Sequence, residues 1–482
     1  MAFIYTKKKD ENDAQDVSLL DLLPGVNNPY LKTEQDFTPQ ELTQLEQIEE
    51  KRMKPYQPVT ILLLGSGGRE AAMAWKIAQS PLTRKLFIAP GNGGTDLYGE
   101  NVPSLDPEDF EAVSEFISAH GVDLVVCGPE APLVNGLADF LSEHHPGLLV
   151  VGPDREGARL EGSKDFSKAF MIRHNIPTAA YETFSPGDQE PAEEFMDQLT
   201  PPFVLKADGL AAGKGVIICP EREEAQQALS DLWEGSVGAV GQKVVIEEFL
   251  EGIECSVFVA TDGTDYVVLP VAKDYKRVGD GDEGPNTGGM GSVSPVPFAD
   301  ETFMAKVEER IIRPTLEGLR EEEIPYQGFL FLGLMNVEGD PYVIEYNCRM
   351  GDPETEVVMP RLQSDLTELL LAMASGRISE YRLQVDPRTA TCVMLVSGGY
   401  PGQYEKGLEM IIPQDAPDIM LFHSGTKRAE GKLLTNGGRV LAVSAYGEDR
   451  HEALTHCYNT AHQVLFEGKN YRHDIGYDLD LD

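Results

Sequence analysis

The hydrophobic positions of residues 58–160 form short continuous runs, each followed by a glycine-containing loop. The first run, residues 59–64, leads into the sequence GSGGRE and a helical pattern that reaches Lys76. The same form recurs at residues 86–89, 122–127 and 148–151. Strands that are apolar throughout and alternate with helices are typical of a parallel sheet covered on both faces. We therefore predict a doubly wound α/β domain whose glycine loops meet at the carboxyl ends of the strands, where ligands bind.

The pattern after residue 160 changes to short strands with fewer helices between them. The pattern of residues 161–385 predicts one α+β unit, with a lid subdomain at about residues 180–250. The strands expected in this unit are 203–206, 216–219, 244–248 and 255–260, and a helix is expected at 221–233. Residues 388–482 predict a small α+β domain, with expected strands at 391–396, 419–423 and 439–445 and an expected helix from about 452 to 466.

Residues 1–57 predict an extension outside these domains. Most of it is polar and without periodicity, which favours disorder. One short helix is expected after Thr38, because a proline and a capping acid follow and Leu42, Leu45 and Ile48 form one stripe. This helix either docks on the body or a partner, or frays in solvent.

Residues 341–350 predict a strand with two unlike faces. One face carries Val343, Glu345, Asn347 and Arg349, and the other carries Ile344, Tyr346, Cys348 and Met350. Carboxylate and amide oxygens are hard ligands suited to Mg²⁺, and an arginine beside them can hold a second anion. The strand thus indicates a metal-bound phosphate site, with a solvated polar face as the alternative. The turn GDPE that follows adds acids at a rigid corner and favours the site.

Residues 203–219 contain further candidate groups for binding phosphate. Residues 209–215, GLAAGKG, resemble a Walker A loop that is one residue short, with Gly215 where a hydroxyl would hold Mg²⁺. Because strands are predicted on both sides, we interpret this segment as a hairpin lid in which Lys214 and backbone N–H groups contact phosphates. Lys206 lies in an apolar strand, where a buried lysine needs an anion.

Three further segments have a functional and a structural interpretation. The sequence VIEEFL suits a purine slot with a ribose contact, or a hairpin with exposed acids. GSGGRE suits a small phosphate at Gly67, Gly68 and Arg69, or a tight turn; Glu70 at the third glycine position argues against a dinucleotide. Residues 276–291 begin with bases and continue with acids and glycines, which favours an anion-contacting loop over a linker.

Composition narrows the class of protein. The 482 residues include 80 Asp and Glu against 40 Lys and Arg, which argues against nucleic-acid or anionic-membrane partners. No apolar run approaches the roughly 18 residues of a membrane span, and no signal peptide is evident. The six scattered cysteines favour buried thiols in a cytoplasmic protein. No HExxH or GxSxG occurs, so positioning and charge neutralisation around ATP fit better than a nucleophilic side chain.

The formal charge of -40 predicts that stability depends on salt. Such an excess is typical of proteins adapted to a salt-rich cytoplasm, because screening relieves self-repulsion. We expect the melting temperature to rise from low to high KCl in thermal denaturation. A melting temperature that falls over that range would contradict the adaptation and leave a merely acidic protein.

Taken together and in order over about residues 59–477, the motifs resemble the phosphoribosylamine–glycine ligase family of the ATP-grasp superfamily. They are GSGGRE, APGNGGT, GPEAPLV, LEGSK, LKADGLAAGKGV, VIEEFLEG, KRVGDGDEGPNTGGMG, VIEYNCRMGDPE, GGYPG, TNGGRV and YRHDIG. The resemblance implies a pre-ATP-grasp N-terminal domain, central ATP-grasp domains and a small C-terminal domain. It also implies ligation of glycine to 5-phosphoribosylamine with ATP, through glycyl phosphate, by a monomer or a dimer.

The resemblance assigns site residues as well. It implies Mg²⁺ or Mn²⁺ at Glu345 and Asn347, and a catalytic set of Lys206, Lys276, Arg277 and Arg349. ATP contacts are implied for Lys164, Lys206, Gly209, Gly213, Lys214, Gly215, Glu247, Glu248, Leu250 and Glu254. Substrate contacts are expected from Gly67, Gly68, Arg69, Asn92, Gly94, Thr95, Glu130, Pro132, Asp274, Asn286, Thr287, Gly288, Gly289, Met290 and Asp352. The group that holds glycine stays open among Asp274, residues 285–291 and Asp352.

Three positions depart from the family pattern. Ala71 replaces the usual histidine, Met350 the usual phenylalanine, and Glu356 stands where glutamine or methionine is common. Two rival functions also stay open. A bicarbonate-activating carboxylase of the same superfamily is disfavoured by GPNTGGMG, and a non-catalytic nucleotide-binding relative would be expected to lose Glu345 or Asn347.

Overall fold

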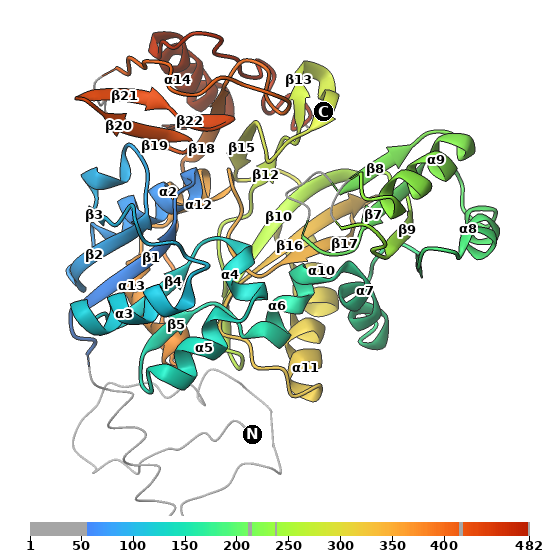
Figure 1. The fold of residues 1–482 in the computed structure, drawn as a ribbon, viewed down its shortest axis with the longest axis horizontal. Helices are drawn as coiled ribbons and strands as arrows, with labels where there is room; N and C mark the ends of the chain where they lie inside the picture. Colours follow the sequence, from blue (N-terminus) through green and yellow to red (C-terminus); the bar gives the residue numbers. More distant parts are fainter. Residues whose placement is uncertain (1–54, 211–214, 237–238, 414–417, 481–482) are drawn as a thin grey trace, which may run out of the picture. The chain divides into compact units, whose positions relative to one another are not determined.

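A computed structural model describes residues 55–480 except 211–214, 237–238 and 414–417 (Figure 1). Residues 58–482 form one compact unit, separate from residues 1–57. The helix expected after Thr38 lies outside the described residues, as do Gly213 and Lys214 of the expected lid.

The N-terminal domain contains a five-stranded parallel sheet in the order β3-β2-β1-β4-β5 (Figure 1). Its central strand is buried from Thr60 to Gly65, with Ile61 and Leu64 fully covered, because helices pack on both faces. The prediction of a doubly wound α/β domain is confirmed. The elements are β1 (Val59–Gly65), α2 (Gly68–Ile77), β2 (Thr83–Pro90), η3 (Thr95–Leu97), β3 (Glu100–Asn101), α3 (Phe110–His120), β4 (Leu124–Cys127), α4 (Glu130–Val134), α5 (Leu137–His144) and β5 (Leu149–Val151).

Two antiparallel sheets form the ATP-grasp part. The sheet β6-β9-β7-β8 and helices α8 and α9 enclose a hydrophobic core of their own. The second sheet has the order β11-β10-β16-β17. The elements are α6 (Arg155–Gly162), α7 (Lys164–Arg173), β6 (Tyr181–Phe184), α8 (Gln189–Met196), β7 (Phe203–Ala207), β8 (Val216–Cys219), α9 (Arg222–Trp233), β9 (Val244–Glu248), β10 (Ile253–Thr261), β11 (Tyr266–Val268), α10 (Glu301–Val307), the π-helix η5 (Glu308–Ile312), α11 (Arg313–Glu321), β16 (Gly328–Val337), β17 (Asp340–Asn347), α12 (Thr355–Arg361), α13 (Leu366–Ala374) and η6 (Ile378–Glu380).

A further antiparallel sheet joins segments far apart in the sequence. Its order, β12-β15-β18-β22-β19, combines two strands that precede residue 300 with three that follow residue 388. A boundary drawn at residue 388 therefore divides this sheet. Its neighbours are two hairpins, β13-β14 and β20-β21, and helix α14. The bounds are β12 (Lys273–Asp274), β13 (Arg277–Gly279), η4 (Asp280–Asp282), β14 (Glu283–Asn286), β15 (Gly291–Ser294), β18 (Thr389–Val396), β19 (Ile419–His423), β20 (Thr426–Ala429), β21 (Lys432–Thr435), β22 (Arg439–Gly447) and α14 (Arg450–Gln463).

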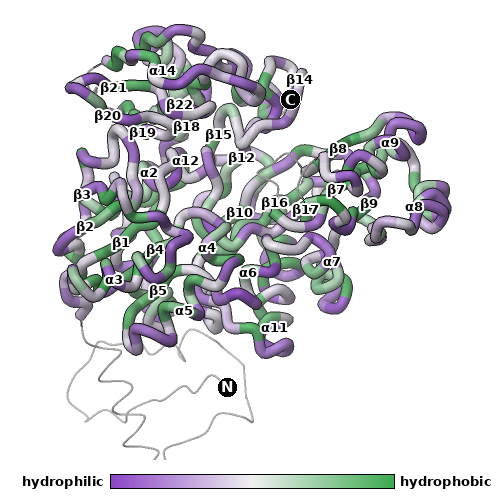
Figure 2. Tube along the Cα trace, in the orientation of Figure 1, coloured by the Kyte–Doolittle hydropathy of each residue, from purple (hydrophilic) through white to green (hydrophobic). Residues whose placement is uncertain are grey.

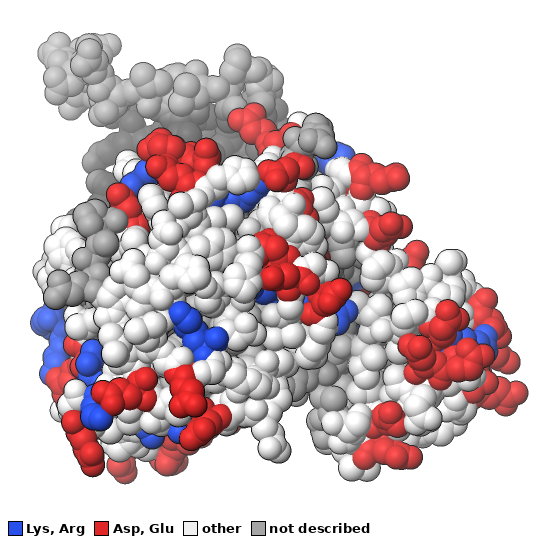
Figure 3. Space-filling view, turned by 90° about the horizontal axis from the view of Figure 1, so that it is seen from above, with Lys and Arg blue, Asp and Glu red and all other residues white. Residues whose placement is uncertain are grey.

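Hydrophobic residues follow the buried strands, and hydrophilic residues follow exposed helices. Figure 2 shows hydrophobic colour along β1, β4 and β7 and hydrophilic colour along α8. All six cysteines are buried and free. On the face drawn in Figure 3, Asp and Glu gather in clusters while Lys and Arg are fewer. Within the described residues, no helix is both long enough and apolar enough to cross a membrane.

Candidate active site

The predicted metal ligands Glu345 and Asn347 lie on one face of β17, opposite Gly333 and Phe331 of β16. Residues two apart on a strand are roughly 6.6–7 Å apart and point the same way. Gly333 leaves room for the acid, because a Cβ there would lie 3.2 Å from Cγ of Glu345, a tight contact.

A β-bulge at Ile344 corrects one part of the sequence prediction. Glu345 pairs with Gly333 but Val343 pairs with Leu334, so Ile344 is an extra residue in the ladder. Val343 consequently faces away from Glu345 and is fully buried, whereas we predicted both on one face. The bulge leaves the carbonyl oxygen of Ile344 to accept a hydrogen bond from Lys206 Nζ at 3.2 Å.

The electrostatics at β17 fit a divalent cation. Burial opposes ionisation of Glu345, but Lys276, Lys206 and Lys164 outweigh it and hold its pKa below the ordinary value. No hydrogen bond to its carboxylate is found among the described residues. The Nδ2 atom of Asn347 is buried and also lacks a partner within that part of the chain. The pair that could bind Mg²⁺ or Mn²⁺ is the ionised Glu345 carboxylate and the Oδ1 atom of Asn347, which accepts from Arg349 at 3.0 Å; the free Nδ2 can only donate.

Lys206 belongs to a buried group of three charges that the sequence analysis did not find. Lys206 Nζ and Lys168 Nζ each lie 2.9 Å from Oε2 of Glu247, and all three residues are less than 5% exposed. Burial lowers the pKa of Lys168 to about 8. The other oxygen of Glu247, Oε1, is buried without a partner among the described residues, so it can accept from a ligand. Lys168 was detectable, because it lies four residues after Lys164 on one helical face.

Lys164 connects helix α7 to the base of the expected lid. Its Nζ donates to the carbonyl oxygen of Gly209 at 2.8 Å, and its backbone N–H donates to Asp208 at 2.7 Å. Burial lowers the pKa of the Lys164 ammonium, although Glu345 opposes the shift. The carbonyl of Gly215 accepts from Ala207 at 2.9 Å and closes the base of the hairpin.

The remaining predicted ATP residues lie at the ends of β9 and β10. Glu248 is exposed and accepts from the backbone N–H of Ala180 at 3.3 Å, and Leu250 is half-buried. Glu254 accepts from Lys276 Nζ at 2.6 Å, and both side chains are 36% exposed. The structure thus brings Lys276 to Glu254 and Glu345.

Arg277 is placed differently from Lys276. It donates to the carbonyl oxygen of Gly284 at 2.8 Å within the β13-β14 hairpin, where its residue partner is Asn286. Neither Arg277 nor Asn286 contacts the β17 ligands in the described residues, so their predicted roles stay predictions.

The first glycine loop is organised by Glu70. The carboxylate accepts from the backbone N–H of Gly67 and from Arg69 Nε, both at 2.6 Å. We expected Glu70 to disfavour a dinucleotide loop. Its side chain fills the space beside two glycines: a Cβ at Gly65 would lie 2.5 Å from Glu70, and a Cβ at Gly128 would lie 2.0 Å from it. The Arg69 guanidinium turns inward, donates to the carbonyl of Met350 at 3.0 Å and is 8% exposed.

The second glycine loop is held by its own polar side chains. Asn92 Nδ2 donates to Ser66 O at 2.9 Å and to His423 O at 2.7 Å, and Asn92 Oδ1 accepts from Gly94 N–H at 3.0 Å. Thr95 is fully buried. Asn92 therefore joins the loop to strand β19 of the C-terminal part.

Arg349 connects β17 to the N-terminal domain. Its guanidinium contacts Glu161 at 2.6 Å and Glu130 at 3.3 Å, and it donates to Oδ1 of Asn347 at 3.0 Å. Pro132, two residues after Glu130, is buried. Glu161 was missed although it stands in the LEGSK motif, where an acid beside an apolar position could have indicated a buried partner.

Arg439 and Tyr400, neither of them predicted, hold the loop of residues 286–291. Arg439 Nη1 donates to the carbonyl oxygens of Gly288 and Asp352, the latter at 2.7 Å, and Tyr400 OH accepts from the N–H of Gly288 at 3.1 Å. Thr287 Oγ1 accepts from Gly289 N–H at 2.9 Å. Met290 is fully buried, so its predicted substrate contact, if made, is through backbone atoms.

The GDPE turn contributes a half-buried acid, Asp352, and a buried acid, Glu354, with different surroundings. Asp352 accepts from the backbone N–H of Arg69 at 3.2 Å and pairs with Arg439 at 3.1 Å. Glu354 accepts from Ser256 Oγ at 3.0 Å, and burial together with Asp274 raises its pKa to about 8. Burial also raises the pKa of Asp274.

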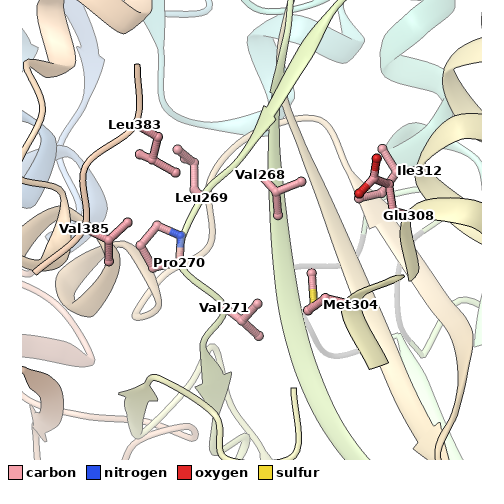
Figure 4. A pocket seen from close by; sticks show the side chains of 9 residues that line it. All are labelled: Val268, Leu269, Pro270, Val271, Met304, Glu308, Ile312, Leu383 and Val385. Carbon is pink, nitrogen blue, oxygen red and sulfur yellow. The ribbon is translucent and has the colours of Figure 1, made fainter. Parts of the chain in front are cut away.

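A separate pocket of about 320 Å³ lies away from these residues (Figure 4). Apolar side chains and Glu308 line it, and none of the predicted site residues does. Its lining comes from β11, α10, η5 and the segment before β18, so it plays no part in the site described above.

Comparison with known proteins gave matches over most of the chain. The phosphoribosylglycinamide synthetase N domain matches residues 59–161, the ATP-grasp (A) domain 162–355 and the C domain 390–478. Phosphoribosylamine–glycine ligase of Vibrio vulnificus is 46% identical over 426 residues, covering 87% of this chain and 98% of that protein. A bifunctional purine biosynthetic protein of Pichia angusta is 44% identical over 429 residues, and the chain spans about half (54%) of its length.

Solved structures agree with these matches. The crystal structure of phosphoribosylamine–glycine ligase from Thermotoga maritima has a TM-score of 0.75 and 39% identity, covering 86% of this chain and 100% of that one. A biotin carboxylase domain from Hydrogenobacter thermophilus, in complex with MgADP and bicarbonate, has a TM-score of 0.65 and 14% identity, covering 86% of this chain and 92% of that one. The second likeness is one of fold.

Proposed function

The chain belongs to the phosphoribosylglycinamide synthetase family and has phosphoribosylamine–glycine ligase activity in purine biosynthesis, and we propose that it performs this reaction at the residues around Glu345. The observation that supports this location is an ionised Glu345 surrounded by three lysines, with Asn347 beside it. The ATP-grasp fold implies ATP binding.

In this proposal Lys164, Lys206 and Lys276 neutralise the phosphate charge of ATP, since their charges favour the ionised form of the Glu345 carboxylate. Glu345 and Asn347 hold Mg²⁺ or Mn²⁺, which, when bound, supplies further neutralisation of the β- and γ-phosphates. The free Oε1 of Glu247 accepts from the adenine amino group, while Lys168 and Lys206 keep its carboxylate in place.

The glycine carboxylate attacks the γ-phosphorus, and ADP leaves as glycyl phosphate forms. The amine of 5-phosphoribosylamine then attacks the acyl carbon, phosphate leaves, and glycinamide ribonucleotide results. Arg349 orients Asn347, because its guanidinium already binds two acids and donates to the amide oxygen.

The phosphate of 5-phosphoribosylamine is placed at the start of α2. There the N–H of Gly67 donates to Glu70, and the N–H of Arg69 donates to Asp352. The N–H of Gly68 has no such partner among the described residues, so we assign it to the substrate phosphate. A helix N-terminus favours such an anion. Whether the working protein is a monomer or a dimer is open to size-exclusion chromatography, and a cytoplasmic location stays a proposal.

The test is ADP release by the purified protein with MgATP, glycine and freshly generated 5-phosphoribosylamine, each omitted in turn, at low and high KCl. We expect ADP only when both co-substrates are present. ADP formed with bicarbonate instead would support the carboxylase alternative. ATP binding without any ADP at either salt would support a non-catalytic relative.

A further inference from the structure

Glu356 occupies a position that the mechanism above does not use. Its side chain is fully buried on α12, which packs against α2. A Cβ on Gly68 would lie 2.3 Å from Oε1 of Glu356. The carboxyl group therefore sits directly beside the N–H group to which we assign the substrate phosphate.

The Glu356 carboxyl has no conventional donor. Both of its oxygens, together with Oδ1 of Asp352, are buried atoms that lack a hydrogen-bond partner in the described part of the chain. The two carboxyl groups lie over neighbouring glycines, because a Cβ on Gly67 would lie 3.0 Å from Oδ2 of Asp352 and a Cβ on Gly68 would lie 2.3 Å from Oε1 of Glu356. Two ionised carboxylates only accept, so a hydrogen bond between them requires a proton on one.

The charged neighbours decide which acid carries this proton. From α2, Arg69 faces the pair but is bonded to the adjacent glutamate; from β22, Arg439 lies 3.1 Å from Oδ1 of Asp352. Cys392 on β18 faces Glu356, and β15 has no titratable residue. Asp352 thus has a cation of its own and Glu356 has none in direct contact. Burial, followed by the charge of Asp352, raises the pKa of Glu356 well above its usual range.

We propose that Glu356 is neutral in the working protein and donates its proton to Asp352, and that it is thereby a positioning residue for the phosphate of 5-phosphoribosylamine. A neutral Glu356 fixes Asp352, which accepts from the N–H of Arg69, and so fixes the first turn of α2. An ionised Glu356 would place a negative charge against Gly68 and repel the phosphate. Glutamine, common here in the family that the sequence resembles, would donate in the same way without titrating.

The kinetic test rests on the proposed function and compares Glu356→Gln with the unchanged protein from about pH 7 to pH 9.5. We expect similar KM values for 5-phosphoribosylamine near neutrality. We expect the KM of the unchanged protein to equal that of Glu356→Gln wherever Glu356 is neutral and to exceed it only at a pH where Glu356 ionises, with kcat little affected in both. Glu317→Gln, an exposed glutamate of α11, should follow the unchanged protein. A KM of the unchanged protein that already exceeds that of Glu356→Gln about tenfold near pH 7 would mean that Glu356 is ionised there and would overturn the proposal.

A second test does not depend on ligase activity. An infrared difference spectrum between the unchanged protein and Glu356→Gln should contain the carbonyl stretch of one protonated carboxyl group at neutral pH. The subtraction removes the contribution of Glu354, which both proteins retain. If Glu356→Gln does not fold, Asp352→Asn takes its place in the subtraction. The amide at position 352 can donate a hydrogen bond to an ionised Glu356, so this variant should also lack the band of the protonated carboxyl group. Absence of the band from the difference spectrum would overturn the proposal, whereas its presence without turnover would count against the proposed function alone.

Discussion

Glu345→Gln is expected to lower kcat for ADP formation about 10³-fold, or about 4 kcal/mol in transition-state stabilisation. The amide keeps the size of the side chain but removes the negative charge that three lysines hold in its ionised form. A divalent cation then loses its only charged ligand at β17, and the lysines lose the acid that balances them. Steady-state ADP release measures kcat, and calorimetric titration of MgADP measures binding separately.

The matched control is Glu338→Gln, at the exposed turn of the same β16-β17 hairpin. It should retain activity and MgADP binding within about twofold, since surface substitutions away from contacts usually have small effects. If Glu345→Gln retained more than about a tenth of the kcat, the metal assignment to β17 would be wrong.

Lys206→Met is expected to have the second largest effect, about 10²-fold in kcat together with about 2 kcal/mol in unfolding free energy. Methionine fills the space but leaves Glu247 with Lys168 as its one remaining cation, and leaves the carbonyl of Ile344 without its donor. The destabilisation stays below that of a completely broken buried pair because Lys168 remains. Urea unfolding and ADP release measure the two effects on the same preparation.

Lys168→Met separates the two roles of the buried group. It removes an equivalent contact to Glu247, at the same 2.9 Å, so it should destabilise the fold by a similar amount. Its kcat should fall much less, because Lys168 bonds Glu247 and Thr178 and, unlike Lys206, donates no hydrogen bond to β17 itself. Equal losses of kcat in the two variants would mean that Lys206 acts through Glu247 alone.

The N-terminal sheet could be predicted because its signal is local. Continuous apolar runs and glycine loops recur within about a hundred residues, and each strand pairs in parallel with a neighbour from the same region. The metal ligands were predictable for the same reason, since alternation along one strand places Glu345 and Asn347 together. The prediction for Val343 was wrong because a bulge depends on the partner strand, and nothing in residues 341–350 reports that Ile344 is skipped.

The contacts that complete the site are long-range. Arg439 reaches Asp352 across 87 positions of sequence, and Cys348 N–H reaches Glu161 across 187. The periodicity of a single segment does not indicate such pairs. From the sequence alone, charged residues such as Arg439 are therefore expected on the surface. Lys168 is the exception, because its spacing from Lys164 was visible in the sequence.

The sheet that combines β12 and β15 with β18, β22 and β19 constrains the order of events during synthesis. The ribosome makes residues 291–294 almost a hundred residues before their partner strand β18 emerges, and domains fold as units only when their strands are present. Until then the loop of residues 286–291 also lacks Arg439 and Tyr400, which hold it in the finished protein. A nascent chain can thus complete its N-terminal sheet and the strand that carries Glu345 and Asn347 early, while the loop of residues 286–291 lacks its supports until most of the C-terminal strands have emerged. The substrate side of the site is therefore the last part of it to be assembled.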